Sequence, residues 1–186
     1  AQESRGLGDV YKRQGDSASL GEVCTLISAL SRTPLKQCFA ITGSINQFGE
    51  VQAVGGVNEK IEGFFRLCEA RGLTGEQGAI IPHSNVSTLM LDERVLQAVR
   101  AGQFHVYSVR HVDEALSLLV GEDAGTPNEK GHFPKGSVNA RVVERLREIA
   151  EIGMGEEDKP EQAKEALTAA LPEKPKKPRA KKPTPE

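Results

Sequence analysis

Apolar side chains recur along this chain at two periods, and the longer of these predicts helices. Between residues 20 and 30 they stand three or four positions apart, which places them on one face of an amphipathic helix. The positions are Leu20, Val23, Cys24, Ile27 and Leu30. The pattern stops near Pro34, where we expect the helix to end.

Three further segments show helical spacing. Residues 57–72 have an apolar face followed by Gly72, a suitable C-terminal cap. The apolar face consists of Ile61, Phe64, Phe65 and Cys68. Residues 92–102 and 111–121 are shorter segments of the same type, so four helices are predicted in this part of the chain.

The shorter period predicts strands. Residues 38–42, 78–82 and 104–109 are apolar or alternating runs of strand length. Residues 45–54 alternate on either side of a polar turn at 46–49, which predicts a hairpin. Strands that alternate with helices indicate an α/β domain with a mixed sheet and flanking helices.

These elements divide the chain into five parts. The predicted parts are an unstructured or non-native lead-in (1–14), the α/β domain (15–121), a turn-rich linker (122–138), an amphipathic helix (139–153) and a disordered tail rich in Pro, Lys and Ala (154–186). The helix of residues 139–153 could dock on the domain or stand apart. The lead-in resembles translated library-adaptor sequence, so we expect the natural segment before Gly15 to be missing and the chain to be a fragment.

Charge is balanced overall but uneven along the chain. Lys and Arg number 24 and Asp and Glu number 26, for a formal net charge of -2. Residues 172–186 contain six basic and two acidic side chains, so a basic tail follows a mildly acidic body. The tail has no interleaved aromatic residues, so contact with nucleic acid is possible but unsupported, and solubility or tethering is the favoured role.

The cysteines and the hydropathy exclude several classes of protein. Cys24, Cys38 and Cys68 are odd in number, without C-x-x-C spacing, so neither a disulfide framework nor a zinc site is indicated. No apolar run reaches the ~18 to 20 residues of a membrane span, and no signal peptide is visible. We expect reduced core thiols, no membrane and a cytoplasmic protein.

Two serines stand where the first helix begins, in the stretch GDSASLGEV. Ser19 and Glu22 match a capping box, and Asp16 or Ser17 could also cap the helix. A serine at this place could instead be a nucleophile, because the unpaired N–H groups of a helix start can hold an oxyanion. Capping is the commoner role, but a box that uses Ser19 leaves Ser17 free.

A nucleophilic serine requires a base, and the histidines are poor candidates. His83, His105, His111 and His132 have no suggestive neighbours, and the G-x-S-x-G elbow of triad hydrolases is absent. Lys60 remains, in the first turn of the helix of residues 57–72, where the dipole favours a neutral amine. An ordinary lysine has a pKa of ~10.4, so only roughly one in 2,500 is neutral at pH 7 and burial would have to lower that pKa.

Four stretches together resemble a known family. GDSAS, AITGSINQFGEVQAVGGVNEKIEG, GAIIP and VDEALSLL occur in this order and are similar to the proteolytic domain of the Lon ATP-dependent proteases, closest to the LonB-like branch. The resemblance runs from about Gly15 to Leu119. It implies the Lon proteolytic fold and a serine endopeptidase with a Ser-Lys dyad, active in bacterial protein quality control.

The family's site residues fall on matching positions. Ser17 occupies the nucleophile position of the G-[PD]-S-A-[GS] pattern, and Ser19 occupies its last position. Lys60 matches the catalytic lysine, and Thr42 matches a threonine that lies close to that lysine and orients its amine. Family members carry strands just ahead of the serine, where this chain has GLGDVYKRQ.

The resemblance also implies partners and a source of energy. Lon proteases act as hexamers on unfolded polypeptides that an ATPase module delivers. This chain has no G-x-x-x-x-G-K-[ST] phosphate loop, so we expect ATP to bind on a module missing from it, and no cofactor or metal within it. The alternative is a non-catalytic Lon-like module of a recombination-type ATPase, used for assembly or DNA contact. The presence of both Ser17 and Lys60 argues against that alternative.

Overall fold

A computed structural model describes residues 16–153. The chain divides into two units between residues 146 and 147. The second unit is described only for residues 147–153, which are helical. The predicted lead-in and the predicted disordered tail lie outside the described residues. The assignments of residues 122–138 as a linker and of 139–153 as a separate segment stay predictions.

The predicted helices and strands are present, most of them within three residues of their expected bounds. The helices of the domain are α2 (Ser19–Ser31), α3 (Val57–Arg71), α4 (Glu93–Arg100) and α5 (Val112–Val120). Short 3-10 turns, η1 (Asp16–Ala18) and η2 (His83–Thr88), precede α2 and follow β4. Helix α2 ends before Pro34 because Arg32 adopts a left-handed conformation, and its N–H donates to Ala29 O at 3.4 Å.

The strands form two sheets. They are β1 (Phe39–Ile41), β2 (Ser44–Ile45), β3 (Val51–Gln52), β4 (Gly78–Pro82) and β5 (His105–Val109). Three of them make a parallel sheet in the order β1-β4-β5, and β2 pairs with β3 as the predicted antiparallel hairpin. The α/β fold class is therefore confirmed, and the antiparallel pairing forms a separate ribbon beside the parallel sheet.

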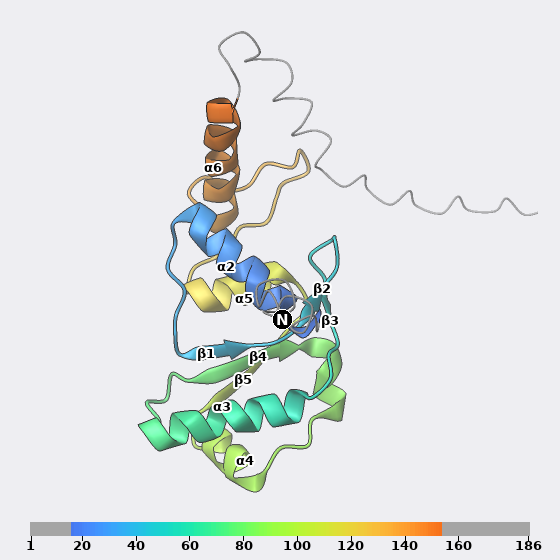
Figure 1. Ribbon diagram of the computed structural model, residues 1–186, viewed down its shortest axis with the longest axis vertical. Coiled ribbons are helices and arrows are strands. Elements are labelled where there is room, and N and C mark those ends of the chain that lie inside the picture. The colour runs from blue at the N-terminus through green and yellow to red at the C-terminus, as the bar shows by residue number, and fades with distance from the viewer. Residues whose placement is uncertain (1–15, 154–186) are drawn as a thin grey trace, which may run out of the picture. The chain divides into compact units, whose positions relative to one another are not determined.

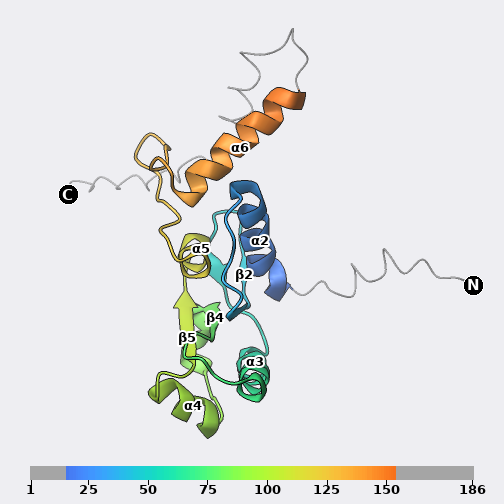
Figure 2. The same ribbon diagram turned by 90° about the vertical axis from the view of Figure 1, so that its left-hand side faces the viewer.

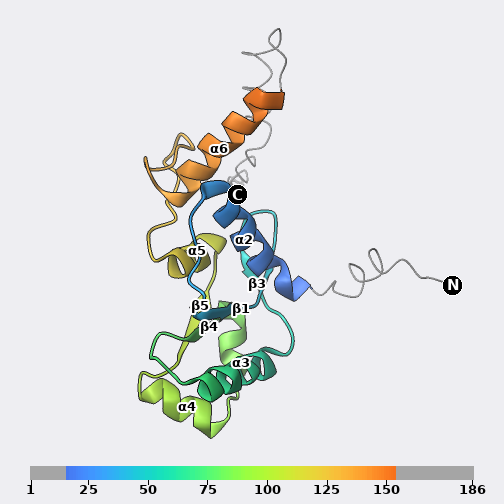
Figure 3. The same ribbon diagram turned by 60° about the vertical axis from the view of Figure 1, so that its left-hand side comes forward.

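The parallel sheet separates two layers of helices (Figures 1 and 2). The central strand β4 is buried throughout: Ile80 packs with residues of α2 and α5, while Ala79 and Ile81 pack with residues of α3 and α4. Crossovers between parallel strands are right-handed, so two successive steps in one direction, β1 to β4 to β5, place α3 and α4 on the same face. Figure 3 shows the same separation from a third direction.

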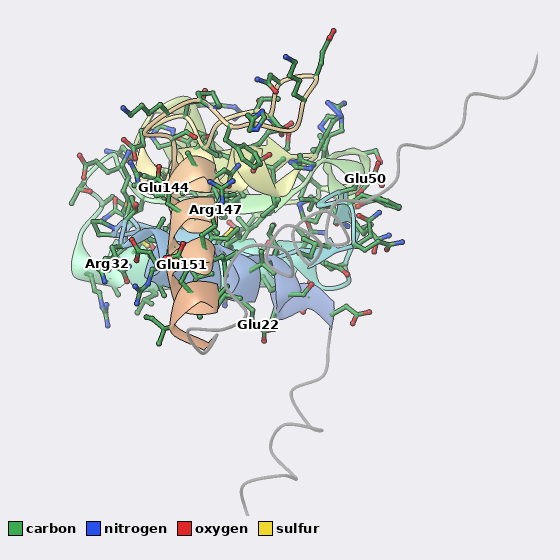
Figure 4. All side chains as sticks on the ribbon, turned by 90° about the horizontal axis from the view of Figure 1, so that it is seen from above. Glu22, Arg32, Glu50, Glu144, Arg147 and Glu151 are labelled. Atoms are coloured by element: carbon green, nitrogen blue, oxygen red, sulfur yellow. The ribbon has the colours of Figure 1, made fainter. Side chains whose placement is uncertain are left out.

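Helix α6 (Val138–Gly153) follows the domain, and its first turn is anchored. Asn139 Nδ2 donates to Asp113 Oδ1 at 2.9 Å and to the carbonyl of Gly125 at 3.0 Å, and Val138 is fully buried. Farther along, Glu144, Arg147 and Glu151 are exposed and lie three and four positions apart, so opposite charges alternate along α6 (Figure 4). Of the helices between residues 16 and 153, none is both long and apolar enough to cross a membrane.

Candidate active site

The turn that carries Ser17 is fastened to the corner that follows β1. The carbonyl oxygen of Ser17 accepts two hydrogen bonds, from Gly43 N at 2.9 Å and from Thr42 Oγ1 at 3.1 Å. In return, Leu20 N of α2 donates to the carbonyl of Gly43 at 3.1 Å. These bonds fix the backbone of Ser17 at the carboxyl end of β1, and its side chain is half-buried.

Gly43 permits this close approach. A Cβ atom at residue 43 would lie 2.9 Å from Leu20 Cδ2 and 3.2 Å from Val51 Cγ1, closer than normal packing allows. The corner therefore fits between α2 and β3 only because residue 43 has no side chain. The periodic pattern of the sequence does not indicate this requirement, because Gly43 lies between the two segments predicted as strands, residues 38–42 and 45–54.

The capping-box prediction for Ser19 is wrong. Ser19 is the first residue of α2, and the position before it, Ala18, makes no side-chain capping bond. The Ser19 hydroxyl donates to Asp16 O at 2.8 Å and accepts from Ile45 N at 3.1 Å, so it joins the helix start to β2. Glu22 is exposed instead of folding back on the helix terminus (Figure 4). A partner 26 residues away satisfies the hydroxyl in place of the local cap.

Lys60 approaches the same corner from the other layer of helices. Helix α3 begins after Gly56, which has φ of +68°, a left-handed conformation that suits glycine. Lys60 lies in the first turn, where its N–H donates to Gly56 O at 3.1 Å. Its Nζ donates to Thr42 Oγ1 at 3.1 Å, so the two candidate residues reach one threonine from opposite sides.

Thr42 links the two sides by its single hydroxyl. It is buried at 8% exposure, and its hydroxyl proton goes to the carbonyl of Ser17. A hydroxyl has only one proton, so Thr42 Oγ1 acts as the acceptor in its bond with Lys60 Nζ. The Ser17 Oγ makes no hydrogen bond with any residue of the range 16–153, and a direct Ser17–Lys60 bond is not formed there.

These residues line one pocket of about 480 Å³. Ser17, Thr42 and Lys60 lie at its polar part, and Ile61, Phe64 and Ala40 contribute to its apolar wall. The pocket lies beside β1, an edge strand of the parallel sheet. The arrangement offers a hydroxyl, an amine and an apolar wall to an extended ligand.

Comparison with known proteins decides the family. Residues 8–122 match the model of the Lon protease (S16) C-terminal proteolytic domain, which covers more than half of the chain. The chain belongs to this Lon family. The predicted resemblance, from about residue 15 to 119, is confirmed.

Curated relatives agree with this assignment. A "Putative Lon protease homolog" of Haemophilus influenzae is 50% identical over 131 residues, 70% of this chain and 22% of the relative. A protein of the same name in Escherichia coli is 55% identical over 106 residues, 57% of this chain and 18% of the relative. An "Archaeal Lon protease" of Methanocaldococcus jannaschii is 38% identical over 112 residues, 60% of this chain and 15% of the relative. The chain therefore spans about a fifth of the length of the two bacterial relatives.

Among residues 16–153, the histidines and cysteines lie away from the pocket, whereas the carboxylate residue Glu59 lines it beside Lys60. Within residues 16–153, no histidine lines it: His105 Nε2 bonds the carbonyl of Gly75 at 2.8 Å, and His111 Nε2 bonds that of Phe48 at 3.0 Å. Residues 16–153 contain no group of three side chains suited to a metal ion. A histidine base and a metal-activated water thus have no candidate among these side chains.

The cysteines are free thiols, as predicted. Burial raises the pKa of the Cys24 thiol to about 12, with a smaller contribution from the charge of Asp113. Burial also raises the pKa of Cys68. Both thiols therefore stay protonated at neutral pH and are poor nucleophiles.

Proposed function

We propose that this chain is the proteolytic domain of an ATP-dependent serine endopeptidase that uses Ser17 as nucleophile and Lys60 as general base. The observation that carries the proposal is the connection through Thr42. The carbonyl of Ser17 and the amine of Lys60 both bond the hydroxyl of Thr42, although the three residues are far apart in the chain, and all three line one pocket. The resemblance to the Lon family implies the same residue types at these positions.

The proposed reaction begins with a proton transfer. The neutral amine of Lys60 takes the proton of Ser17 Oγ, and that oxygen attacks the scissile carbonyl carbon. The tetrahedral intermediate collapses to an acyl-enzyme ester, the C–N bond breaks, and the Lys60 ammonium returns the proton to the leaving amine. Water, activated by the same amine, then hydrolyses the ester.

Two other groups assist in this proposal. Thr42, which is already committed as a donor to the backbone, holds the amine of Lys60 by an accepted hydrogen bond. Backbone N–H groups near Ser17 stabilise the oxyanion, a contribution worth about 3 to 4 kcal/mol per donor in other proteases. Lys60 is exposed among the described residues, so substrate itself is expected to exclude water from the amine.

We further propose unfolded polypeptides as substrates, a cytoplasmic hexamer as the assembly and an ATPase module as the unfoldase. The alternative, a non-catalytic Lon-like assembly or DNA-contact module, has no need of a pocket in which serine, threonine and lysine converge. The pocket therefore favours the protease.

A serine-directed organophosphonate tests the proposal, because it forms a stable adduct only with an activated serine. We expect mass spectrometry to find the adduct on Ser17, and on no residue in Ser17→Ala. The variant Ser19→Ala, which removes a neighbouring hydroxyl, is the matched control and should still react. An adduct on Ser19, or none on the parent chain, would contradict the proposed nucleophile.

A further inference from the structure

The helix that carries Lys60 starts without local support. Helix α3 has no side-chain cap at its N-terminus, where Gly56 occupies the capping position. A Cβ atom built on Gly55 meets nothing within 4 Å, so the chain just ahead of α3 is not held by packing at this residue. Val57 and Ile61 are buried in the core at 6% and 1% exposure, so hydrophobic packing holds the inner face of the helix start. Hydrogen bonds to the residues ahead of the helix add to this packing.

Asn85 supplies the first of these contacts. Its Oδ1 accepts from Val54 N at 3.0 Å, and its Nδ2 donates to Val54 O at 3.0 Å. The side-chain amide thus bonds both backbone groups of the residue just ahead of the two glycines, as a neighbouring strand would. Two bonds of equal length to one residue fix the orientation of Val54 as well as its position.

The segment that carries Asn85 is well anchored. Residue 85 lies in η2, which follows directly on the fully buried central strand β4. Thr88 Oγ1 donates to the carbonyl of Asn85 at 3.0 Å. Asn85 therefore transmits the position of the sheet to the start of α3.

Asn58 provides a second link between these two segments. Here the side chain belongs to α3, and the backbone group belongs to the residues that follow η2. Asn58 Oδ1, in the first turn of α3 and two residues before Lys60, accepts from Met90 N at 3.1 Å. Val54 and Asn58, on either side of Gly55 and Gly56, are thus both bonded to residues 85–90.

We infer that Asn85 is a positioning residue for Lys60, which holds the first turn of α3 so that the amine reaches Thr42. The inference rests on the proposed function for its catalytic consequence, but its geometric consequence is independent of activity. Without Asn85, the unpacked glycines let the start of α3 move, and the 3.1 Å contact between Lys60 Nζ and Thr42 Oγ1 is the first to be lost.

Gln77 offers a matched control at the other end of the same helix. Its Oε1 accepts from Thr74 N at 2.8 Å, and its Nε2 donates to Gly72 O at 3.3 Å. Gln77→Ala therefore removes one accepted and one donated backbone bond, as Asn85→Ala does, but beyond the C-terminus of α3. A purely structural role predicts similar effects from both variants.

The test measures the reactivity of lysine amines toward an acylating reagent, residue by residue, by mass spectrometry. In Asn85→Ala we expect Lys60 to react several-fold faster than in the parent, while the exposed Lys36 is unchanged; Gln77→Ala should change neither. Asn85→Asp keeps the bond from Val54 N but sets a carboxylate oxygen against Val54 O, so it should also raise the reactivity of Lys60 and serves where Asn85→Ala fails to fold. Unchanged Lys60 reactivity in the folded Asn85 variants, or an equal increase in Gln77→Ala, would overturn the inference.

Peptide cleavage separates this inference from the proposed function. If both hold, Asn85→Ala lowers kcat by up to about 100-fold with little change in KM, because misplacement by about 1 Å has effects of this size. Gln77→Ala should retain near-parental kcat. A parent chain that cleaves nothing, together with faster Lys60 acylation in Asn85→Ala, would remove the dyad mechanism and leave the positioning role in place. Parental kcat in Asn85→Ala would refute the catalytic consequence.

Discussion

The two sides of the candidate site are built differently. On the serine side, the backbone of Ser17 is held by Thr42 and Gly43, and Gly43 packs so closely against Leu20 that no side chain fits. On the lysine side, the long, exposed side chain of Lys60 extends from a helix that starts after two glycines. A single 3.1 Å hydrogen bond, to Thr42 Oγ1, holds its amine. Thus backbone bonds hold the proposed nucleophile, Ser17, whereas a single side-chain bond holds the amine of the proposed base, Lys60.

Because of this difference, substitutions on the two sides should have different effects on stability and on activity. Substitutions on the serine side should act on stability as well as on chemistry, because the same atoms pack α2 on the corner. Substitutions on the lysine side should act on chemistry with little loss of stability, because few buried atoms are involved.

Removal of the proposed nucleophile should have the largest effect. Ser17→Ala should abolish cleavage of an unfolded peptide while the melting temperature changes little, because Ser17 bonds its neighbours through its carbonyl and not its hydroxyl. Ser19→Ala should keep most of the activity and lower stability by about 1 to 2 kcal/mol, because it leaves Ile45 N without its partner. The reverse ranking would reassign the nucleophile.

The charge of residue 60 provides the next test. Arginine keeps the cation but stays protonated at any useful pH, so Lys60→Arg should be as inactive as Lys60→Ala if Lys60 is the general base. Cleavage by the parent should rise with pH as the neutral amine becomes more abundant. Near-parental cleavage by Lys60→Arg would eliminate the dyad. The free energy of unfolding of both variants should lie within about 0.5 kcal/mol of the parent value, since the side chain of Lys60 is exposed.

Thr42 joins both sides, so its loss should affect activity and stability together. Thr42→Val removes the hydroxyl at nearly constant volume and breaks the bonds to Ser17 O and Lys60 Nζ. We expect cleavage to fall by about 10-fold to 100-fold and stability by about 1 to 2 kcal/mol. Thr42→Ser keeps the hydroxyl and should recover most of the activity, measured with the same peptide and by thermal unfolding.

Substitution of two glycines compares the packing of the two sides without changing a reactive group. Gly43→Ala should lower stability by about 1 to 3 kcal/mol, because the new methyl group meets Leu20 and Val51. Gly55→Ala should stay within about 0.5 kcal/mol, because the new methyl group meets nothing within 4 Å. Urea unfolding of the two variants measures this difference, and equal effects would show that the serine side is no tighter than the lysine side.

The sequence predicted the elements well and their connections poorly. Helical and strand periods are local, so α2, α3 and the buried β4 could be located from spacing alone. The resemblance brought Ser17, Thr42 and Lys60 to notice, but spacing does not show that one hydroxyl connects them. Asn85 escaped attention because its partner, Val54, is 31 residues away, and a single polar residue in an irregular segment leaves no periodic signal. The cap assigned to Ser19 failed for the same reason: a tertiary partner outcompeted the local one.

The smallest predicted effect concerns the cysteines, of which Cys24 lies on α2, after the turn that carries Ser17, and Cys68 lies on α3 with Lys60. Cys24 of α2 is fully buried and its pKa is raised to about 12, whereas Cys38, before β1, is half-buried. At pH 8 the thiolate fraction of Cys24 is about a thousandfold below that of an ordinary thiol, so a thiol reagent should modify Cys38 first and Cys24 only when the chain unfolds.

The raised pKa of Cys24 also makes stability depend on pH. Because its folded-state pKa lies above the unfolded value, the stabilisation from the protonated thiol is complete below pH ~9 and is lost as the pH rises toward 12. Cys68 of α3 has a raised pKa and 6% exposure, so it should react between the other two. Modification of Cys24 before Cys68 in the native protein would mean that α2 opens more readily than α3, the opposite of the tight serine side that the bonds of Ser17 and Gly43 indicate.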